Sequence, residues 1–287
     1  LASMRDIKRR KESVASTGQI TKAMKLVSTV KLQKAKSRAE SNKPYFTLLY
    51  ETMCSTLARS GGVEHRYLNG REDGRKLVIA ISSNRGLAGG YNNNIVKEIA
   101  SAFNPEETDI YALGKKGLEG LSRKGFKILE DYSEVMNAPL YSDAIHIGKN
   151  VLAAFESGEV SEIYLAYTSF KNTVVQEPQL IKLLPIDMDE MMKDMSMDID
   201  TTTLMNYEPE VDAALEMIIP KYMNNIIYGA FVEAVASENG ARMQAMDSAT
   251  KNADDMIADL SLKYNRARQS SITQELTEII AGAEAIS

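Results

Sequence analysis

The pattern of apolar and polar positions divides the chain into two long helical ends and a middle that alternates strand with helix. Residues 3 to about 59 carry sparse apolar positions and few helix breakers, which predicts one long helix. From about 208 to 286, small and medium apolar residues again recur at helical spacing. We expect a kink or break at Pro44 in the first helix and a kink at Pro220 in the second.

A seven-residue spacing also runs along the first helix. Its members become small and polar, so it is a poor dimerisation seam on its own. The spacing comprises Ile7, Val14, Thr21, Ser28 and Ala35.

Five apolar runs in the middle of the chain have the length and residue types of buried strands. Their alternation with helical segments indicates a mostly parallel, Rossmann-like α/β sheet. The stretch 187–200 is acidic and rich in methionine, has no clear period, and is interpreted as a mobile surface loop. The expected strands are 76–82, 109–114, 126–131, 162–170 and 179–186, and the expected helices are 92–103, 115–124 and 142–157.

These elements predict three segments: a helix at 1–59, an α/β domain at 60–207 and a second helix at 208–287. Charge follows nearly the same division. Residues 1–59 carry thirteen Lys and Arg against four acidic residues, whereas residues 207–287 carry six against thirteen. The basic and acidic arms therefore either attract each other or face different partners.

Composition narrows the class of protein. The single cysteine, Cys54, excludes a disulfide framework and indicates a reducing compartment. No run of eighteen apolar residues is present, and the first residues lack the apolar region of a secretory signal. We therefore expect a protein that is cytosolic or peripheral to a membrane.

One loop resembles a phosphate-binding turn, because ISSNRGLAGGYNNN (81–94) follows an expected strand and precedes an expected helix. Its three glycines fit neither G-x-G-x-x-G nor a Walker loop, so a structural turn is favoured. His65 and His146 are the only histidines, lack a ligand cluster, and are expected at the surface or in loops. The residues thus predict no catalytic, cofactor or metal site.

Three stretches resemble the gamma subunit of F-type ATP synthases. Residues 4–36 are similar to the family's N-terminal helix, and residues 237–257 with 264–285 to its C-terminal helix. SSNRGLAGGYN resembles a Ser-Asp-Arg-Gly-Leu-Cys/Ala-Gly run, with Asn84 where the family usually has Asp. The C-terminal signature I-T-x-E-x-x-[DE]-x-x-x-G-A is matched by Ile272, Thr273, Glu275, Glu278, Gly282 and Ala283.

The resemblance implies a non-catalytic rotor whose terminal helices form an antiparallel coiled coil, the central stalk of the enzyme. Its expected partners are the hexamer of alpha and beta subunits, the epsilon subunit and the membrane ring of c subunits. Proton flow through the ring would turn the stalk and drive the beta sites through ATP synthesis, or ATP hydrolysis in reverse. ATP, ADP and Mg would bind alpha and beta, with no cofactor on this chain. A peripheral location on the cytoplasmic face of a bacterial cell membrane is expected.

The resemblance also implies contact residues, by motif. One group is expected at an acidic helix-turn region of the beta subunits, and a second where the hexamer grips the C-terminal helix. For each of these positions, an ordinary residue of the stalk surface stays open as the alternative. For the chain as a whole, the residues leave two other functions open: a nucleotide-dependent α/β enzyme with helical arms, or a coiled-coil adaptor or nucleic-acid binder. The first group is Ile20, Thr21, Lys22, Met24 and Lys25, and the second is Arg242, Arg268, Gln269, Thr273 and Glu275.

Overall fold

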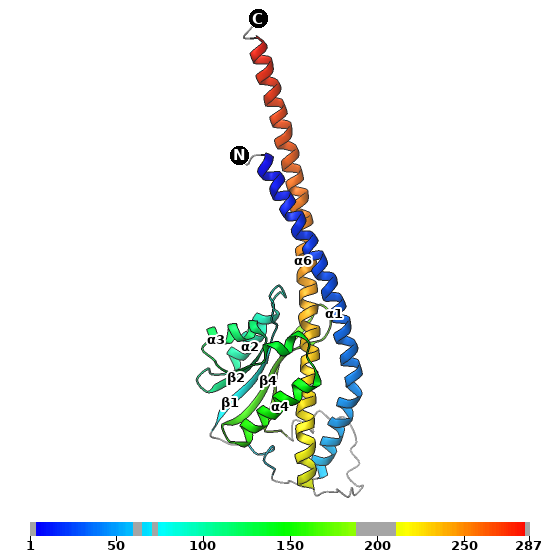
Figure 1. Ribbon diagram of the computed structural model, residues 1–287, viewed down its shortest axis with the longest axis vertical. Helices are drawn as coiled ribbons and strands as arrows, with labels where there is room; N and C mark the ends of the chain where they lie inside the picture. The colour runs from blue at the N-terminus through cyan, green and yellow to red at the C-terminus, as the bar shows by residue number, and fades with distance from the viewer. Residues whose placement is uncertain (1–3, 60–64, 71–73, 188–210, 285–287) are drawn as a thin grey trace. The chain divides into compact units, whose positions relative to one another are not determined.

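The computed structural model describes residues 4–59, 65–70, 74–187 and 211–284. Two long helices, α1 (Met4–Arg59) and α6 (Val211–Glu284), are its longest elements (Figure 1). Each continues through its proline, so Pro44 causes no break. Apart from Asp187, the predicted loop at 187–200 lies outside the described residues.

A five-stranded sheet forms the middle of the chain, in the order β3-β2-β1-β4-β5. The first four strands along the chain pair in parallel, and β5 is antiparallel to β4. The predicted mostly parallel sheet is therefore confirmed, with strand bounds that differ by a few residues. The strands are β1 (Arg75–Ile81), β2 (Thr108–Leu113), β3 (Lys127–Asp131), β4 (Val160–Phe170) and β5 (Gln176–Leu184).

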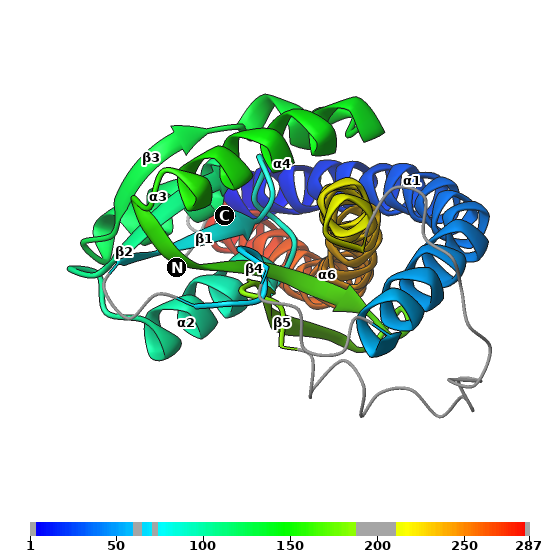
Figure 2. The same ribbon diagram turned by 90° about the horizontal axis from the view of Figure 1, so that it is seen from below.

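Helices cover both faces of the sheet (Figure 2). Alternation along β1 sends Val78 and Ala80 into one core, and Leu77, Ile79 and Ile81 into the other. The first core is closed by α2 and α3, and the second by α4 with parts of α1 and α6. These shorter helices are α2 (Tyr91–Ala102), α3 (Lys115–Arg123) and α4 (Tyr141–Glu156), with a 3-10 turn η1 (Ser133–Asn137) before α4.

The chain divides into two compact units, and each contains part of both long helices. The sheet unit is Thr29–Ala241, and the arm unit is Leu1–Ser28 with Arg242–Ser287. Within the arm unit, Thr21 bonds to Thr250 and Lys25 bonds to Asp247. Positions that rise along α1 therefore meet positions that fall along α6, which confirms the antiparallel pair that the family resemblance implied.

Candidate functional site: the helix pair

The arm unit is a two-helix seam with alternating steps of three and four residues. Every seam position on α1 is at least partly covered, and half of them belong to the spacing noticed in the sequence. Steps of three and four keep one stripe of each helix toward its partner. The seam is formed by Met4, Ile7, Lys11, Val14, Gly18, Thr21, Lys25 and Ser28 of α1, and by Met243, Met246, Thr250, Ala253, Ile257, Leu260, Tyr264, Ala267 and Ser271 of α6.

Small residues bring the helix backbones close at the centre of this seam. A Cβ atom added to Gly18 would lie 3.3 Å from the Cβ of Ala253, which is closer than most real Cβ contacts. The hydroxyls of Thr21 and Thr250 share a hydrogen bond of 2.8 Å one turn away. These contacts require small side chains and a single register.

An ion pair continues the seam. The Lys25 ammonium donates to the Asp247 carboxylate at 2.5 Å, and Lys251 approaches the same carboxylate at 2.9 Å. The hydrogen bonds from Lys25 and Lys251 lower the pKa of Asp247. Basic α1 and acidic α6 thus attract each other here, which was one of the two readings of the charge pattern.

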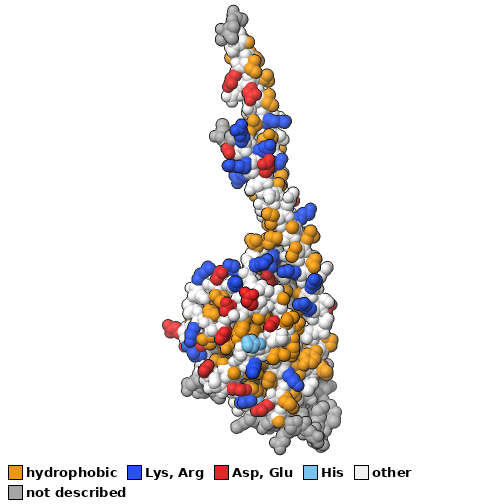
Figure 3. All heavy atoms as spheres, viewed as in Figure 1, with side chains coloured by type: hydrophobic (Ala, Val, Ile, Leu, Met, Phe, Trp, Pro, Cys, Tyr) orange, Lys and Arg blue, Asp and Glu red, His pale blue; other side chains and the backbone are white. Residues whose placement is uncertain are grey.

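Large apolar side chains remain on the outer surface of the arm unit. Ile20, Leu26 and Val27 are more than half exposed on α1, and Leu262 is 61% exposed on α6. Hydrophobic side chains are visible along the surface of the helix pair, interspersed with Lys and Arg (Figure 3). All described side chains of residues 272–283 are exposed as well. These exposed apolar residues make the outer surface of the arm unit a candidate for contact with other molecules.

The structure separates the predicted contact residues by exposure. Thr21 is buried and Lys25 is half covered, because both face α6. Thr21 therefore presents almost no surface to another subunit, and its bond to α6 gives it a role within the pair. Ile20, Lys22, Arg268, Gln269, Thr273 and Glu275 are exposed, and Met24 and Arg242 are partly exposed. Their contacts with other subunits stay predictions.

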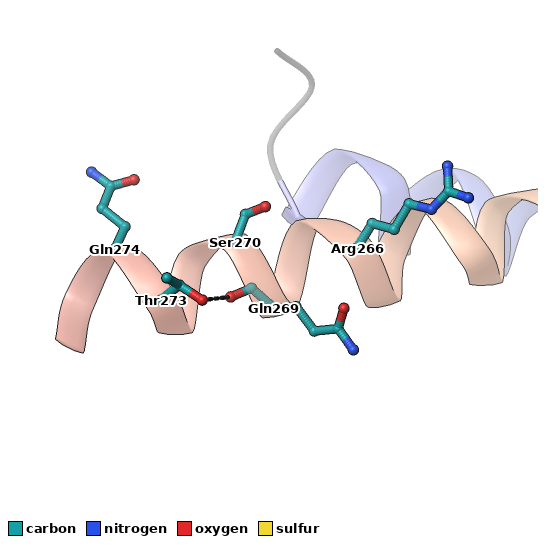
Figure 4. Close-up of a pocket in the computed structure, with 5 residues that line it drawn as sticks. All are labelled: Arg266, Gln269, Ser270, Thr273 and Gln274. Atoms are coloured by element: carbon teal, nitrogen blue, oxygen red, sulfur yellow. Dashed lines mark hydrogen bonds between the residues drawn. The ribbon is translucent and has the colours of Figure 1, made fainter. Parts of the chain in front are cut away.

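The exposed part of α6 carries two rows of polar side chains (Figure 4). Gln269 and Thr273 lie on one side, where the Thr273 hydroxyl donates to the Gln269 carbonyl oxygen at 2.9 Å. Arg266, Ser270 and Gln274 form the other row. All five belong to a single helix, so they form an open polar surface and not an enclosed site.

The glycine-rich turn after β1 forms hydrogen bonds with neighbouring loops of the same chain. The Asn84 amide donates to the Ser133 carbonyl oxygen at 2.8 Å, and its oxygen accepts from the Lys115 N–H at 3.1 Å. An aspartate could not make the first bond, which explains an asparagine here. Gly114 has φ +111° and leaves no room for a Cβ beside Ser82. This bonding agrees with the structural turn that the sequence favoured.

Helix α6 packs against the sheet where ligands bind in many doubly wound folds. That place is the switch point, here between β1 and β4, because the connection from β1 to β2 passes through α2 on one face of the sheet, and the connection from β3 to β4 passes through α4 on the other face. The Tyr91 hydroxyl, after β1, donates to the Ala234 carbonyl oxygen, and the Ser237 hydroxyl donates to the carbonyl oxygen of Thr168 on β4. Neither Tyr91 nor Ser237 carries a sequence signal for this role, because only the fold brings them to this place.

The two histidines differ from each other. His146 is exposed on α4 and His65 lies in the loop before β1, so each fits the expected surface or loop position, but His65 is buried there, with 5% of its surface exposed. Its ring lies beside that of Tyr67, which packs on Phe155 in the large core. Within the described ranges, no three His, Cys, Asp or Glu side chains are grouped to hold a metal, and no helix is long and apolar enough to span a membrane.

Comparison with known proteins adds a full-length match. The profile of the family described as ATP synthase matches residues 3–286. The chain is 66% identical to the ATP synthase gamma chain of Lachnoclostridium phytofermentans, over 100% of both chains. It is 42% identical to that of Alkaliphilus metalliredigens, over 99% of this chain and 98% of the relative. An Acetobacterium woodii relative, 37% identical over 99% of each, is named as the sodium ion specific gamma chain.

Solved structures with the same fold were also found. A chain of the Euglena gracilis mitochondrial ATP synthase, in a structure of OSCP, F1 and c-ring, has a TM-score of 0.68 and 20% identity; the match covers 99% of this chain and 94% of that one. A chain from the Tetrahymena thermophila central stalk and c-ring has a TM-score of 0.58 and 24% identity, covering 80% and 99%. At these identities the likeness shows the fold.

Proposed function

Because the chain belongs to the family of ATP synthase gamma chains, we propose that it is the central-stalk rotor of an F-type ATP synthase, with no catalytic site of its own. One observation carries this proposal: an antiparallel helix pair with a thin seam of small, apolar and polar side chains, and an outer surface on which large apolar side chains are exposed in the described chain. Such a pair suits a part that is held from outside by a ring of other subunits.

The partners proposed are the alpha and beta hexamer around the arm unit, with epsilon and the c-ring at the sheet unit. The matched structures support the hexamer and the ring, because one is a structure of OSCP, F1 and c-ring and the other of a central stalk with its c-ring. Epsilon comes from the sequence resemblance alone. Contact with the c-ring would place the chain at the cytoplasmic face of the cell membrane.

We expect proton flow to drive the rotation. We identify no binding site for the coupling ion among the described residues of this chain, and one relative is named sodium ion specific. The coupling ion is therefore a property to measure on the complex, by comparing ATP synthesis under proton and sodium gradients.

Nucleotide and Mg are proposed to bind alpha and beta only. The packing of α6 on the switch point supports this, because Tyr91 and Ser237 use that crevice for bonds between α6 and the sheet. A nucleotide-dependent enzyme would need the crevice for its ligand. A nucleic-acid binder would instead bind polyanions with a steep salt dependence.

Co-purification tests the proposal. We expect one copy of the chain in each complex of alpha and beta, together with epsilon and the c-ring. The isolated chain should show no saturable binding of Mg-ATP in a nucleotide titration. Nucleotide hydrolysis by the isolated chain, or recovery of an intact, coupled complex that lacks it, would contradict the proposed role.

A further inference from the structure

A groove of about 880 Å³ opens in the sheet unit between the two long helices and the edge strand β5. Its helical wall is aromatic and aliphatic, with Phe46 and Tyr50 from α1 and Tyr222 and Ile226 from α6. The opposite wall consists of residues 179–183 of β5 with Tyr167 of β4.

This groove follows the open edge of β5. Successive side chains of a strand point to opposite faces, and Leu180 packs in one core of the sheet while Ile181 packs against the other. Because the groove is lined by Leu180 and Ile181 and by their neighbours in sequence, it runs along the edge of the sheet, where the backbone of β5 is accessible. Within the described part of the chain β5 pairs with β4 alone, so its outer N–H and C=O groups form a template for another strand.

The open space beside Gly229 on α6 is a second, independent observation that points to an occupant of the groove. Glycine weakens a helix interior relative to alanine, so it usually has a local reason. Gly240 has one, because an added Cβ would lie 3.2 Å from the Phe170 ring. At Gly229 an added Cβ would meet nothing within 4 Å, although the residue lines the groove. The described chain does not require this glycine, which leaves space and bare backbone on the groove wall.

The charges of the groove are unequal. Carboxylates of Glu40, Asp187 and Glu233 line it. Of its two lysines, Lys182 binds Glu162 at 2.6 Å, outside the lining residues. The groove is thus net acidic and complements a basic side chain.

We propose that β5 accepts an extended segment of another protein subunit as an additional strand. Its backbone pairs with the edge of β5, alternate apolar side chains pack on Phe46, Tyr50 and Tyr222, and a Lys or Arg meets the carboxylates. The exposed strand edge favours a peptide over a small molecule, because a peptide satisfies the backbone groups along the strand. This inference rests on the proposed function, since it takes the chain to be part of a complex.

A photoreactive residue at position 229 tests the occupant directly. Gly229 is replaced by p-benzoylphenylalanine in the full chain, the intact complex is purified and irradiated, and the cross-linked peptides are mapped by mass spectrometry. We expect cross-links to one segment of a different subunit. Cross-links confined to residues 188–210 of this chain, or none at all, would overturn the proposal. The same probe at Lys97, exposed on the other side of the sheet on α2, should not reach that segment.

Amide exchange tests the strand pairing. We expect the amides of residues 179–183 to exchange at least about tenfold more slowly in the complex than in the isolated full chain. Gly229→Leu fills the groove from a position with open space, so it should fold and remove this protection, whereas Gly229→Ala should keep it. Unchanged exchange of β5 in a complex that assembles would overturn the inference and leave the proposed function standing. Failure of the chain to join alpha and beta would overturn both.

Discussion

The two long helices pair in both units, and the two pairings use different side chains. In the sheet unit, Met53 of α1 and Phe231 of α6 are fully buried in one large apolar core. In the arm unit, the same two helices meet through Gly18, Thr21 and Lys25. A large apolar core thus holds the pair where it packs on the sheet, whereas close backbone approach, polar bonds and only a few buried apolar side chains hold it in the arm.

This difference bears on the function of a rotor. A deep apolar lock between a stalk and its surrounding subunits would become a barrier whenever the stalk turns. A thin seam leaves apolar residues such as Ile20 and Leu262 exposed on the outside of the pair. We therefore expect substitutions in the sheet unit to have the larger effect on the free energy of unfolding, and substitutions in the arm unit to have the larger effect on rotation.

The largest expected effect is on the apolar core of the sheet unit. Phe231→Ala removes a fully buried ring and leaves a cavity, so the free energy of unfolding should fall by about 3–5 kcal/mol. Equilibrium denaturation of the isolated chain measures it. Leu262→Ala, at an exposed position of the same helix, is the matched control and should change stability by less than about 0.5 kcal/mol. Equal losses in both variants would remove the contrast between the two pairings.

The next effect concerns helix spacing in the arm. Gly18→Leu forces a side chain against Ala253, and overpacking of about 1–3 kcal/mol is offset by a gain of up to about 1 kcal/mol in helix propensity. We expect the amides around residue 18 to exchange faster than in the unchanged chain. Ala23→Leu, exposed on the same helix, is the control and should not change the exchange. If the two variants exchange alike, close approach at Gly18 does not hold the seam.

Much of the fold was predictable because its signals are local. The buried strands, the helices between them and both terminal helices follow from apolar spacing alone. The seam itself was only half visible in the sequence, since Gly18 and Lys25 do not register as core positions until α6 lies against them. The burial of His65 in its loop was not foreseen for a similar reason, because it depends on Tyr67 and the core beneath.

The candidate site was harder to predict than the fold. Motif matching identified the right helices but not which way each residue faces. Thr21 and Ile20 are neighbours in the motif, yet one is buried against α6 and the other is 59% exposed. The groove beside β5 has no sequence signal, because its lining comes from three separate parts of the chain.

A smaller effect is expected from pH. The folded chain lowers the pKa of Asp247 below its usual 3.8, through hydrogen bonds from Lys25 and Lys251. Because the pKa is lower in the folded chain, the Asp247 carboxylate contributes its full stabilisation of the arm when the pH is above the pKa of the unfolded chain. This contribution is lost as the pH falls through the pKa of the folded chain. Carbon-13 NMR titration should show the pKa of Asp247 rising in Lys25→Gln. The Lys263→Gln control, at an exposed lysine paired with Asp259, should leave it unchanged. If the pKa of Asp247 is the same in Lys25→Gln as in the unchanged chain, the ion pair between Lys25 and Asp247 does not stabilise the seam.

The smallest effect on the chain alone, and the sharpest test of the comparison, comes from its outer surface. Ile20→Ser with Val27→Ser changes two side chains that are more than half exposed, at nearly equal helix propensity, so the isolated chain should keep its stability within about 0.5 kcal/mol. In the assembled complex the same pair should alter the torque or stepping of single molecules during ATP hydrolysis, because these side chains are the ones left for the surrounding subunits. The control is Val174→Ser, exposed in the sheet unit between β4 and β5, which should leave torque and stepping unchanged. Unchanged stepping in the double variant would show that the arm's outer apolar residues are ordinary surface. The difference between the two pairings would then reflect only how each unit is stabilised, and not how a rotor turns.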